Sequence, residues 1–342
     1  MNHVYSAIAL IGSFAFSTLL HSAPLKPIPK ESGFSGSVVG GASAVEYSSN
    51  LVAGTSGKLS DQTIKSINAD PETESSVAPF ITGEVNYTFA ESRTQAYLGV
   101  ALEDLVRYDL AFQLGVKQEL SKKGIVYGAF LFSALPTEVY ADPYVANVAR
   151  ARTDRSSTGA RLGWQNVLGT GLGLEVSSRE IELDEENAGA DLVTNNVITA
   201  DEQTLLNREG TQTEVTVSYL FRISKGHLVV PELNFDRFDL DGKARARDRM
   251  GATLAYFHTR STWSFVGTLF YSSSDYDELN PIYGKKEEVD TIGASLVLTY
   301  GQLFGYKDLS VFGSVAAAES DSNIDFYDQD ASSAMLGLIY QF

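Results

Sequence analysis

The chain has 342 residues and no cysteine, and its 43 acidic and 26 basic side chains give a formal net charge of -17. This acidity disfavours nucleic acid as a partner, and the lack of cysteine excludes disulfides and lipoprotein-type lipidation. The 17 Tyr and 18 Phe, with a mean hydropathy near zero, favour strands that meet lipid on one face and water on the other.

Residues 1–22 are predicted to be a signal peptide. An uncharged apolar run over 7–20 is followed by a Pro-rich stretch from Pro24, and about 20 apolar residues would be needed for a transmembrane helix. Pro24 argues against cleavage directly after Ala23, so cleavage after Ser22 is predicted. Residues 23–33 then form a periplasmic N-terminal segment. Export by this signal and a bacterial outer-membrane location are the expectation.

Residues 34–342 are predicted to form an all-β, transmembrane, up-and-down antiparallel β-barrel. Stretches of alternating character are joined in turn by short polar turns and by longer acidic or Gly/Asn-rich loops, which is the rhythm of such barrels. The predicted strands are 34–47, 79–90, 94–102, 107–120, 125–138, 153–166, 171–182, 211–223, 227–240, 244–258, 262–274, 288–300, 308–319 and 331–342. An even count of about 14 returns both ends to the periplasm. Twelve strands would follow if 94–102 and 107–120 were misread.

The alternation assigns the two faces of several strands. In 211–223, Val215, Val217, Tyr219 and Phe221 are expected to face lipid, opposite Glu214 and other polar residues. Strands 107–120 and 288–300 show the same division. The polar faces should therefore line a watery interior. A soluble sandwich is disfavoured, because its inward faces would be the apolar ones.

The long connections 48–78, 140–152, 184–210, 274–287 and 320–330 are expected to face outward. The acidic stretches 184–186 and 321–330 lack the ordered oxygen ligands of a calcium loop. They are interpreted as solvated loops, and no metal site or cofactor is predicted. The barrel also lacks room for the plug of energy-coupled receptors.

Charged residues at inward positions are candidates for the lining of a pore. Alternating arginines follow a turn expected at Asp241-Gly242, which would place Arg247 opposite Asp236 and Arg249 opposite Asn234. Such guanidiniums can steer anions against an acidic wall, or they can form a salt-bridge ladder that only stiffens the barrel. The candidate pore-lining residues are Arg161, Glu175, Arg179, Glu214, Asp236, Arg247 and Arg249.

Enzymatic chemistry is not expected. After the leader only His227 and His258 remain as histidine bases. Both adjoin predicted periplasmic turns, where a histidine belongs to the aromatic girdle more often than to a site. No catalytic residue is therefore assigned.

The last strand carries a predicted barrel-assembly signal formed by Gly337, Tyr340 and Phe342. Phe342, Tyr340 and Leu338 fall on one strand face, and the terminal aromatic pair would sit in the interfacial girdle. This ending resembles the C-terminal signal of bacterial outer-membrane proteins, except that Met335 stands where a polar residue is usual. The barrel-assembly machinery is thus an expected partner, together with outer-membrane lipid and lipopolysaccharide.

Three segments carry a resemblance to a known family. They read PIPKESGFSG at 27–36, YTFAESRTQ at 87–95 and PTEVYADPY at 136–144. The chain resembles, over nearly its whole mature length, an uncharacterised family of Gram-negative outer-membrane proteins that contain a domain of unknown function. The resemblance implies the barrel and its location, but no substrate and no functional residues.

The sequence predicts a porin-like passive channel for small hydrophilic solutes. The alternative is a plugged barrel that acts as a surface structural protein, adhesin or phage receptor, with loop 48–78 or 184–210 folded inward. A transporter of hydrophobic solutes is disfavoured because the inward positions appear polar in the sequence. The pattern does not define the solute or the oligomeric state.

Overall fold

A computed structural model describes residues 27–54, 63–100, 112–133 and 136–342. The predicted signal peptide, residues 1–22, lies outside these residues. The strands are β1 (Gly33–Ser48), β2 (Val52–Gly54), β3 (Thr73–Phe89), β4 (Thr94–Gly99), β5 (Phe112–Glu119), β6 (Ile125–Phe132), β7 (Thr137–Tyr140), β8 (Arg152–Gln165), β9 (Leu172–Leu183), β10 (Gly210–Tyr219), β11 (Phe221–Ser224), β12 (His227–Leu240), β13 (Arg247–Arg260), β14 (Trp263–Asn280), β15 (Lys285–Gly301), β16 (Leu309–Ser322) and β17 (Gln329–Gln341).

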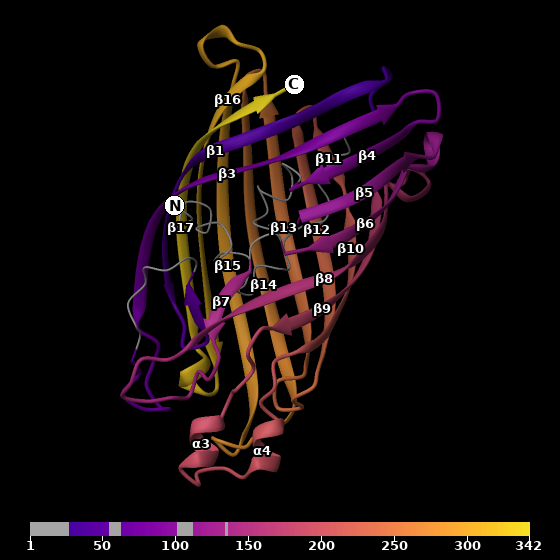
Figure 1. The fold of residues 1–342 in the computed structure, drawn as a ribbon. Coiled ribbons are helices and arrows are strands. Elements are labelled where there is room, and N and C mark those ends of the chain that lie inside the picture. The colour runs from indigo at the N-terminus through magenta and orange to yellow at the C-terminus, as the bar shows by residue number, and fades with distance from the viewer. Residues whose placement is uncertain (1–26, 55–62, 101–111, 134–135) are drawn as a thin grey trace.

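These strands close into an antiparallel barrel, drawn as a ribbon in Figure 1. β1 pairs with β3 on one side and with β17 on the other, which seals the sheet. β6 and β7 both pair with β8, and β10 and β11 both pair with β12, so each couple is one interrupted wall strand. β2 pairs with β7 and is not counted as a strand of the closed wall. The closed wall therefore has 14 strands, which confirms the predicted count and rules out 12.

Several strands are longer than predicted, at the end away from the chain termini. β3 begins at Thr73 rather than at residue 79, and β14 runs on to Asn280. These extensions are mostly polar, so the hydrophobic alternation that reveals a strand weakens where lipid contact stops, while the hydrogen-bonded ladder continues. β5 is described only from Phe112, and 107–111 of the predicted strand lie outside the described residues.

The connection 184–210 contains two short helices, α3 (Ala190–Thr194) and α4 (Ala200–Thr204), where a loop was predicted. A capping box starts α4, because the Thr199 side chain accepts from the Glu202 backbone and the Glu202 carboxylate accepts from the Thr199 backbone. In the described part of the chain, the helices are too short or too polar to cross a membrane.

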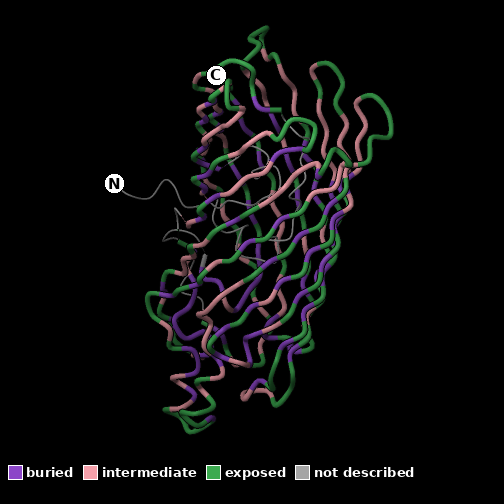
Figure 2. The backbone as a smooth tube through the Cα atoms, turned by 90° about the vertical axis from the view of Figure 1, so that its right-hand side faces the viewer, coloured by how far each residue is buried: buried purple, intermediate pink, exposed green. Residues whose placement is uncertain are grey.

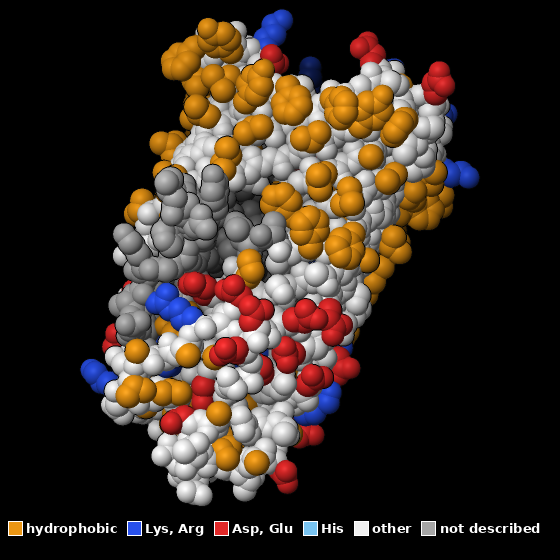
Figure 3. All heavy atoms as spheres, viewed as in Figure 1, with side chains coloured by type: hydrophobic (Ala, Val, Ile, Leu, Met, Phe, Trp, Pro, Cys, Tyr) orange, Lys and Arg blue, Asp and Glu red, His pale blue; other side chains and the backbone are white. Residues whose placement is uncertain are grey.

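Burial alternates residue by residue along the wall, as the colours in Figure 2 show. The predicted faces are confirmed for 211–223, where Val215 and Phe221 are exposed while Glu214 is buried. Outward rings meet near the end with the short turns, in the contacts Phe34–Tyr87, Tyr219–Phe221, Trp263–Tyr300 and Tyr340–Phe342. Figure 3 shows hydrophobic side chains over this half and acidic side chains over the other. The lipid band thus covers the half with the short turns.

Inward-facing rings lie over glycines of the next strand. The ring of Phe270 would come within 2.2 Å of a Cβ added to Gly293, and the ring of Phe312 within 2.7 Å of one added to Gly337. Tyr97 and Tyr127 cover Gly115 and Gly163 in the same way. An aromatic ring that covers a strand glycine shields its backbone and fixes the register.

Replacement of Gly293 by alanine should therefore destabilise the barrel. The new methyl group would displace the Phe270 ring and would also approach the Ala317 carbonyl at 2.9 Å, and overpacking of this kind costs about 1–3 kcal/mol. The midpoint of urea unfolding in lipid vesicles measures the loss. Gly313→Ala is the control, since its nearest neighbouring atom, the Met335 carbonyl oxygen, is 3.9 Å away. Equal midpoints for the two variants would contradict the role of the ring.

Candidate functional site

The structure places all seven candidate pore-lining residues on the inner wall, on five consecutive wall strands. Five of them are buried, and Arg179 and Arg247 are half-buried. The residues that flank them in sequence, such as Leu162, Val215 and Phe235, are exposed on the outer face. The set comprises Arg161 on β8, Glu175 and Arg179 on β9, Glu214 on β10, Asp236 on β12, and Arg247 and Arg249 on β13. Their action in a pore stays a prediction.

Asp236 is the centre of a hydrogen-bonded network on this wall. Arg249 donates from Nε to Oδ2 at 3.2 Å and from Nη2 to Oδ1 at 3.0 Å, which is a bidentate pair. Gln212 donates to Oδ1 at 2.9 Å, and Asn234 donates to Oδ2 at 2.8 Å. Asp236 has no exposed surface, so these donors replace water around the carboxylate. The network joins β10, β12 and β13 across the wall.

The predicted register of the arginine strand is wrong by two residues. Asp236 pairs with Arg249 and Phe238 pairs with Arg247, whereas a two-residue turn at Asp241-Gly242 would have set Arg247 against Asp236. The chain between β12 and β13 instead makes a longer helical turn, in which the backbone N–H groups of Arg245 and Ala246 donate to the Gly242 carbonyl. Because the register shift is two residues and side chains alternate with a period of two, the arginines still face inward. Arg247 is therefore left without the carboxylate that the sequence assigned to it.

A second ion pair lies on β8 and β9. The Nε of Arg161 is 2.9 Å from Oε1 of Glu175, and both side chains are almost fully buried. The Tyr127 hydroxyl donates to the other carboxylate oxygen of Glu175. A paired and buried guanidinium offers little charge to a passing solute, so this pair fits the stiffening alternative better than the selectivity one.

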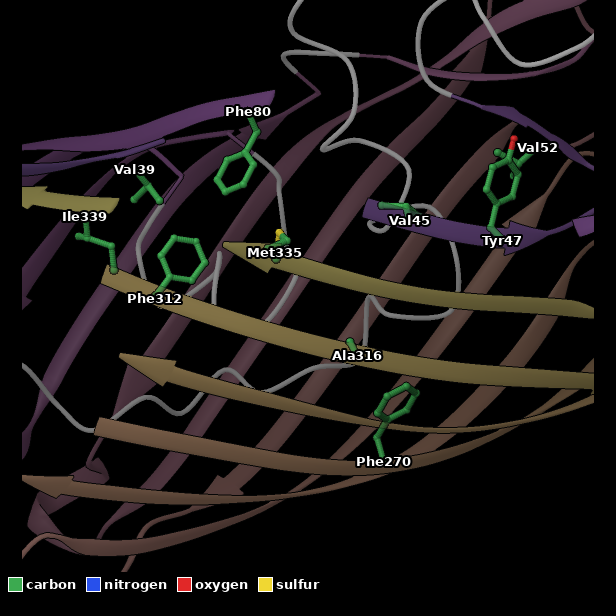
Figure 4. Packing of buried hydrophobic residues seen from close by; sticks show 10 residues of the cluster. All are labelled: Val39, Val45, Tyr47, Val52, Phe80, Phe270, Phe312, Ala316, Met335 and Ile339. Carbon is green, nitrogen blue, oxygen red and sulfur yellow. The ribbon is translucent and has the colours of Figure 1, made fainter. Parts of the chain in front are cut away.

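The opposite side of the inner wall carries an apolar cluster that the sequence did not predict, set among buried Ser and Thr residues such as Ser37, Thr268 and Ser314. Figure 4 shows the cluster, which comes from β1, β2, β3, β14, β16 and β17. Phe80 and Phe312 meet edge to face at 6.3 Å, with Val39, Met335 and Ile339 beside them. The expectation that inward positions are polar thus fails at the cluster residues, while the Ser and Thr positions between them agree with it. Met335, which stands where a polar residue is usual, was the feature of the sequence that could have predicted this cluster.

A second hydrophobic core lies in the long connections, and we refer to it as the cap. Its buried members are Ile64, Tyr144, Ala188, Leu192, Ile198, Leu206, Ile324, Phe326 and Tyr327. They come from the β2–β3, β7–β8, β9–β10 and β16–β17 connections. In the order of strands around the barrel, the β7–β8 and β16–β17 connections lie on opposite sides. The cap therefore spans the mouth opposite the short turns.

Polar groups lock the cap across the mouth. The hydroxyls of Tyr144 and Tyr327 lie 2.7 Å apart, and Asn280 donates to the Tyr327 hydroxyl at 2.7 Å. Arg245 forms a buried ion pair with Glu287, and its guanidinium carbon lies 4.4 Å from the Tyr327 ring centre. Burial alone would lower the pKa of Arg245, but the Glu287 carboxylate outweighs it and holds that pKa well above its ordinary value. Arg245 is thus a structural member of the cap.

The two histidines stack on the outer face at the end of the short turns. The ring centres of His227 and His258 are 4.2 Å apart, and Nδ1 of His227 lies 2.6 Å from the Tyr256 hydroxyl. This places both in the aromatic girdle, as expected. Among the described residues, no three or more His, Asp or Glu side chains are grouped to hold a metal ion.

The C-terminal residues form the seam of the barrel. Gly36 and Phe342 exchange both backbone hydrogen bonds, at 3.0 and 3.1 Å, and the Phe342 ring covers Gly36. Tyr340 points outward, and Gly337 lies under the Phe312 ring. Recognition of these residues by assembly machinery stays a prediction.

The sequence model of a family described as "Protein of unknown function (DUF2860)" matches residues 33–341. A search of curated proteins finds no match.

Solved structures similar to this chain include three barrels of low identity. A "CymD monoaromatic hydrocarbon channel" aligns with a TM-score of 0.49 and 10% identity over 100% of this chain and 99% of that chain. A loop L8 deletion mutant of OmpT, an outer membrane protein of Vibrio cholerae, aligns at 0.40 and 11% over 91% and 99%. The outer membrane channel DcaP of Acinetobacter baumannii aligns at 0.41 and 9% over 91% and 98%. At these values the likenesses carry no argument about activity.

Proposed function

Since the chain belongs to the DUF2860 family, which has no assigned function, we propose from its structure that it is a passive outer-membrane channel for small hydrophilic solutes. The observation that carries this proposal is the charged inner wall of β8 to β13 in a barrel of 14 strands. Barrels of eight strands are filled by side chains, and barrels of sixteen leave an aqueous channel. Transport here would depend on width and electric field, without covalent chemistry.

The cap favours a second candidate function. A mouth spanned by packed loops suits a barrel that acts as a surface structure, such as an adhesin or phage receptor. The two loops predicted to fold inward both contribute to this cap. Loop 48–78 contributes Ile64, and loop 184–210 contributes Leu192 and Leu206. The two candidates differ in whether solutes can pass the cap, because a channel requires the cap to open and a surface structure does not.

Current through purified protein in planar bilayers separates the two candidates. A channel should give discrete conductance steps, and a salt gradient should give a reversal potential that reports its ion preference. The protein must first show the gel mobility shift on boiling that marks a folded barrel. Folded protein without conductance steps would exclude the channel and support the surface structure.

A disulfide across the cap tests whether it gates the pore. Ile64 and Ala146 pair in a β-bridge, and the backbone N–H of Asn147 donates to the Ile64 carbonyl at 2.8 Å. Paired β residues stand about 5 Å apart, which suits a disulfide. We expect oxidised Ile64→Cys/Ala146→Cys protein to carry less current than the same protein after reduction. Each single cysteine variant is a control, because the natural chain has no cysteine. Equal currents before and after reduction would exclude gating at this contact.

A further inference from the structure

Two arginines on the inner wall differ from the paired ones described above. The side chain of Arg155 on β8 has no hydrogen bond or ion pair with any described residue, and the charged groups that act on it are Arg247, Arg208 and Arg179. Arg208 is itself ion-paired with Glu186 at 2.7 Å. Arg247 on β13 donates a long hydrogen bond, 3.4 Å, to the Arg245 carbonyl and has no carboxylate partner in the described part of the chain. Both side chains keep part of their surface exposed.

The neighbouring carboxylates point the other way. Asp154 and Asp248 flank the two arginines in sequence and are exposed on the outer face. Asp248 lies 3.4 Å from Arg237, an outward arginine that also pairs with Asp277 at 2.6 Å. These two carboxylates are therefore separated by the wall from Arg155 and Arg247. On the inner side, Glu287 acts on Arg247, but it is already ion-paired with Arg245. Two like charges that act on each other, neither of them ion-paired with a described carboxylate, favour the binding of an anion.

Apolar side chains form a cluster on β9 and β12, two of the strands between β8 and β13. Arg155 pairs across the sheet with Leu183, and Arg247 pairs with Phe238. Leu183 and Phe238 belong to one buried cluster with Ile181 and Leu240. The guanidinium carbon of Arg247 lies 3.9 Å from the Phe238 ring centre, which holds the side chain in place by a cation–π contact.

We propose that Arg155 and Arg247 form a binding site on the inner wall for a small organic anion, with a carboxylate between the guanidiniums and an apolar body on the Leu183–Phe238 cluster. Planar guanidiniums match carboxylate geometry, and the pair offers donors that no described protein group uses. The site rests on the proposed function, because a solute must enter the barrel to reach it. It names the class of solute: organic acids with an aromatic or aliphatic part.

Benzoate is the probe, and isothermal titration of the folded full-length mature chain in detergent is the measurement. Arg155→Gln/Arg247→Gln should weaken benzoate binding at least about tenfold, the size expected for loss of charge-assisted hydrogen bonds. Arg155→Lys should keep most of the affinity. Arg237→Gln is the matched control, since it removes an arginine from the outer face and should leave binding unchanged. Acetate and benzyl alcohol, which each lack one half of the probe, should bind more weakly than benzoate.

Three results would overturn the site: no benzoate binding, equal benzoate affinity for wild type and the folded double variant, or acetate binding as tight as benzoate binding. Should the double variant fail to fold, the wild type still decides, because raised KCl should weaken benzoate binding and leave benzyl alcohol unaffected. Conductance is scored separately. Benzoate binding without conductance would reject the channel and keep the site, whereas conductance without benzoate binding would reject the site and keep the channel.

Discussion

Asp236→Ala should destabilise the barrel by about 3–5 kcal/mol, because it leaves the buried guanidinium of Arg249 without a counter-charge. Arg249 is 4% exposed and donates hydrogen bonds from Nε and Nη2 to Asp236. Gln212 and Asn234 lose an acceptor in the same step. Urea unfolding in lipid vesicles, followed by tryptophan fluorescence, measures the change.

Two control variants distinguish the effect of breaking the Asp236–Arg249 ion pair from the effect of removing a carboxylate side chain. Asp236→Leu/Arg249→Met removes both charges and should recover most of the stability, because replacing a whole buried pair by apolar groups is often neutral. Asp248→Ala removes an exposed carboxylate next to Arg249 in sequence and should change stability by less than about 1 kcal/mol. If the double variant were as unstable as Asp236→Ala, the ion pair would not be the cause.

Glu287→Ala should open the cap and leave the barrel closed. Glu287 is 1% exposed and is the ion-pair partner of Arg245, so its removal strands a buried cation at a cost of about 3–5 kcal/mol. That cost falls on the loops, because the strand ladders do not depend on Arg245. Limited trypsin digestion in this region should accelerate at least about tenfold, while the gel mobility shift of the folded barrel is retained.

The same variant is informative in bilayers. If the cap gates the pore, Glu287→Ala should raise the mean current above that of the wild type. Glu288→Ala is the matched control, since the next residue faces outward and is exposed. Fast digestion without any rise in current would mean that the cap loosens but does not obstruct a pathway.

The wall of this protein is predictable from local sequence. A strand exposes alternate side chains to opposite faces, so the period of two in 211–223 and 288–300 is visible without any partner. The short turns and the terminal aromatics mark where strands end on the side of the C-terminus. These signals are local, and they are enough for strand number, closure and the side that meets lipid. They weaken where strands leave the lipid, which is why β3 and β14 were predicted too short.

The candidate site depends on which strands meet, and only the tertiary structure decided that. The length of the β12–β13 turn moved Asp236 from Arg247 to Arg249, so one arginine was neutralised and the other was not. Closure brought Phe80 and Phe312 together on an inner arc that sequence alternation had assigned to polar groups. The cap joins Tyr144 to Tyr327 over 183 residues. Alternation records which face a side chain takes, whereas pairing between distant strands and loops follows from register and packing, which no local pattern encodes.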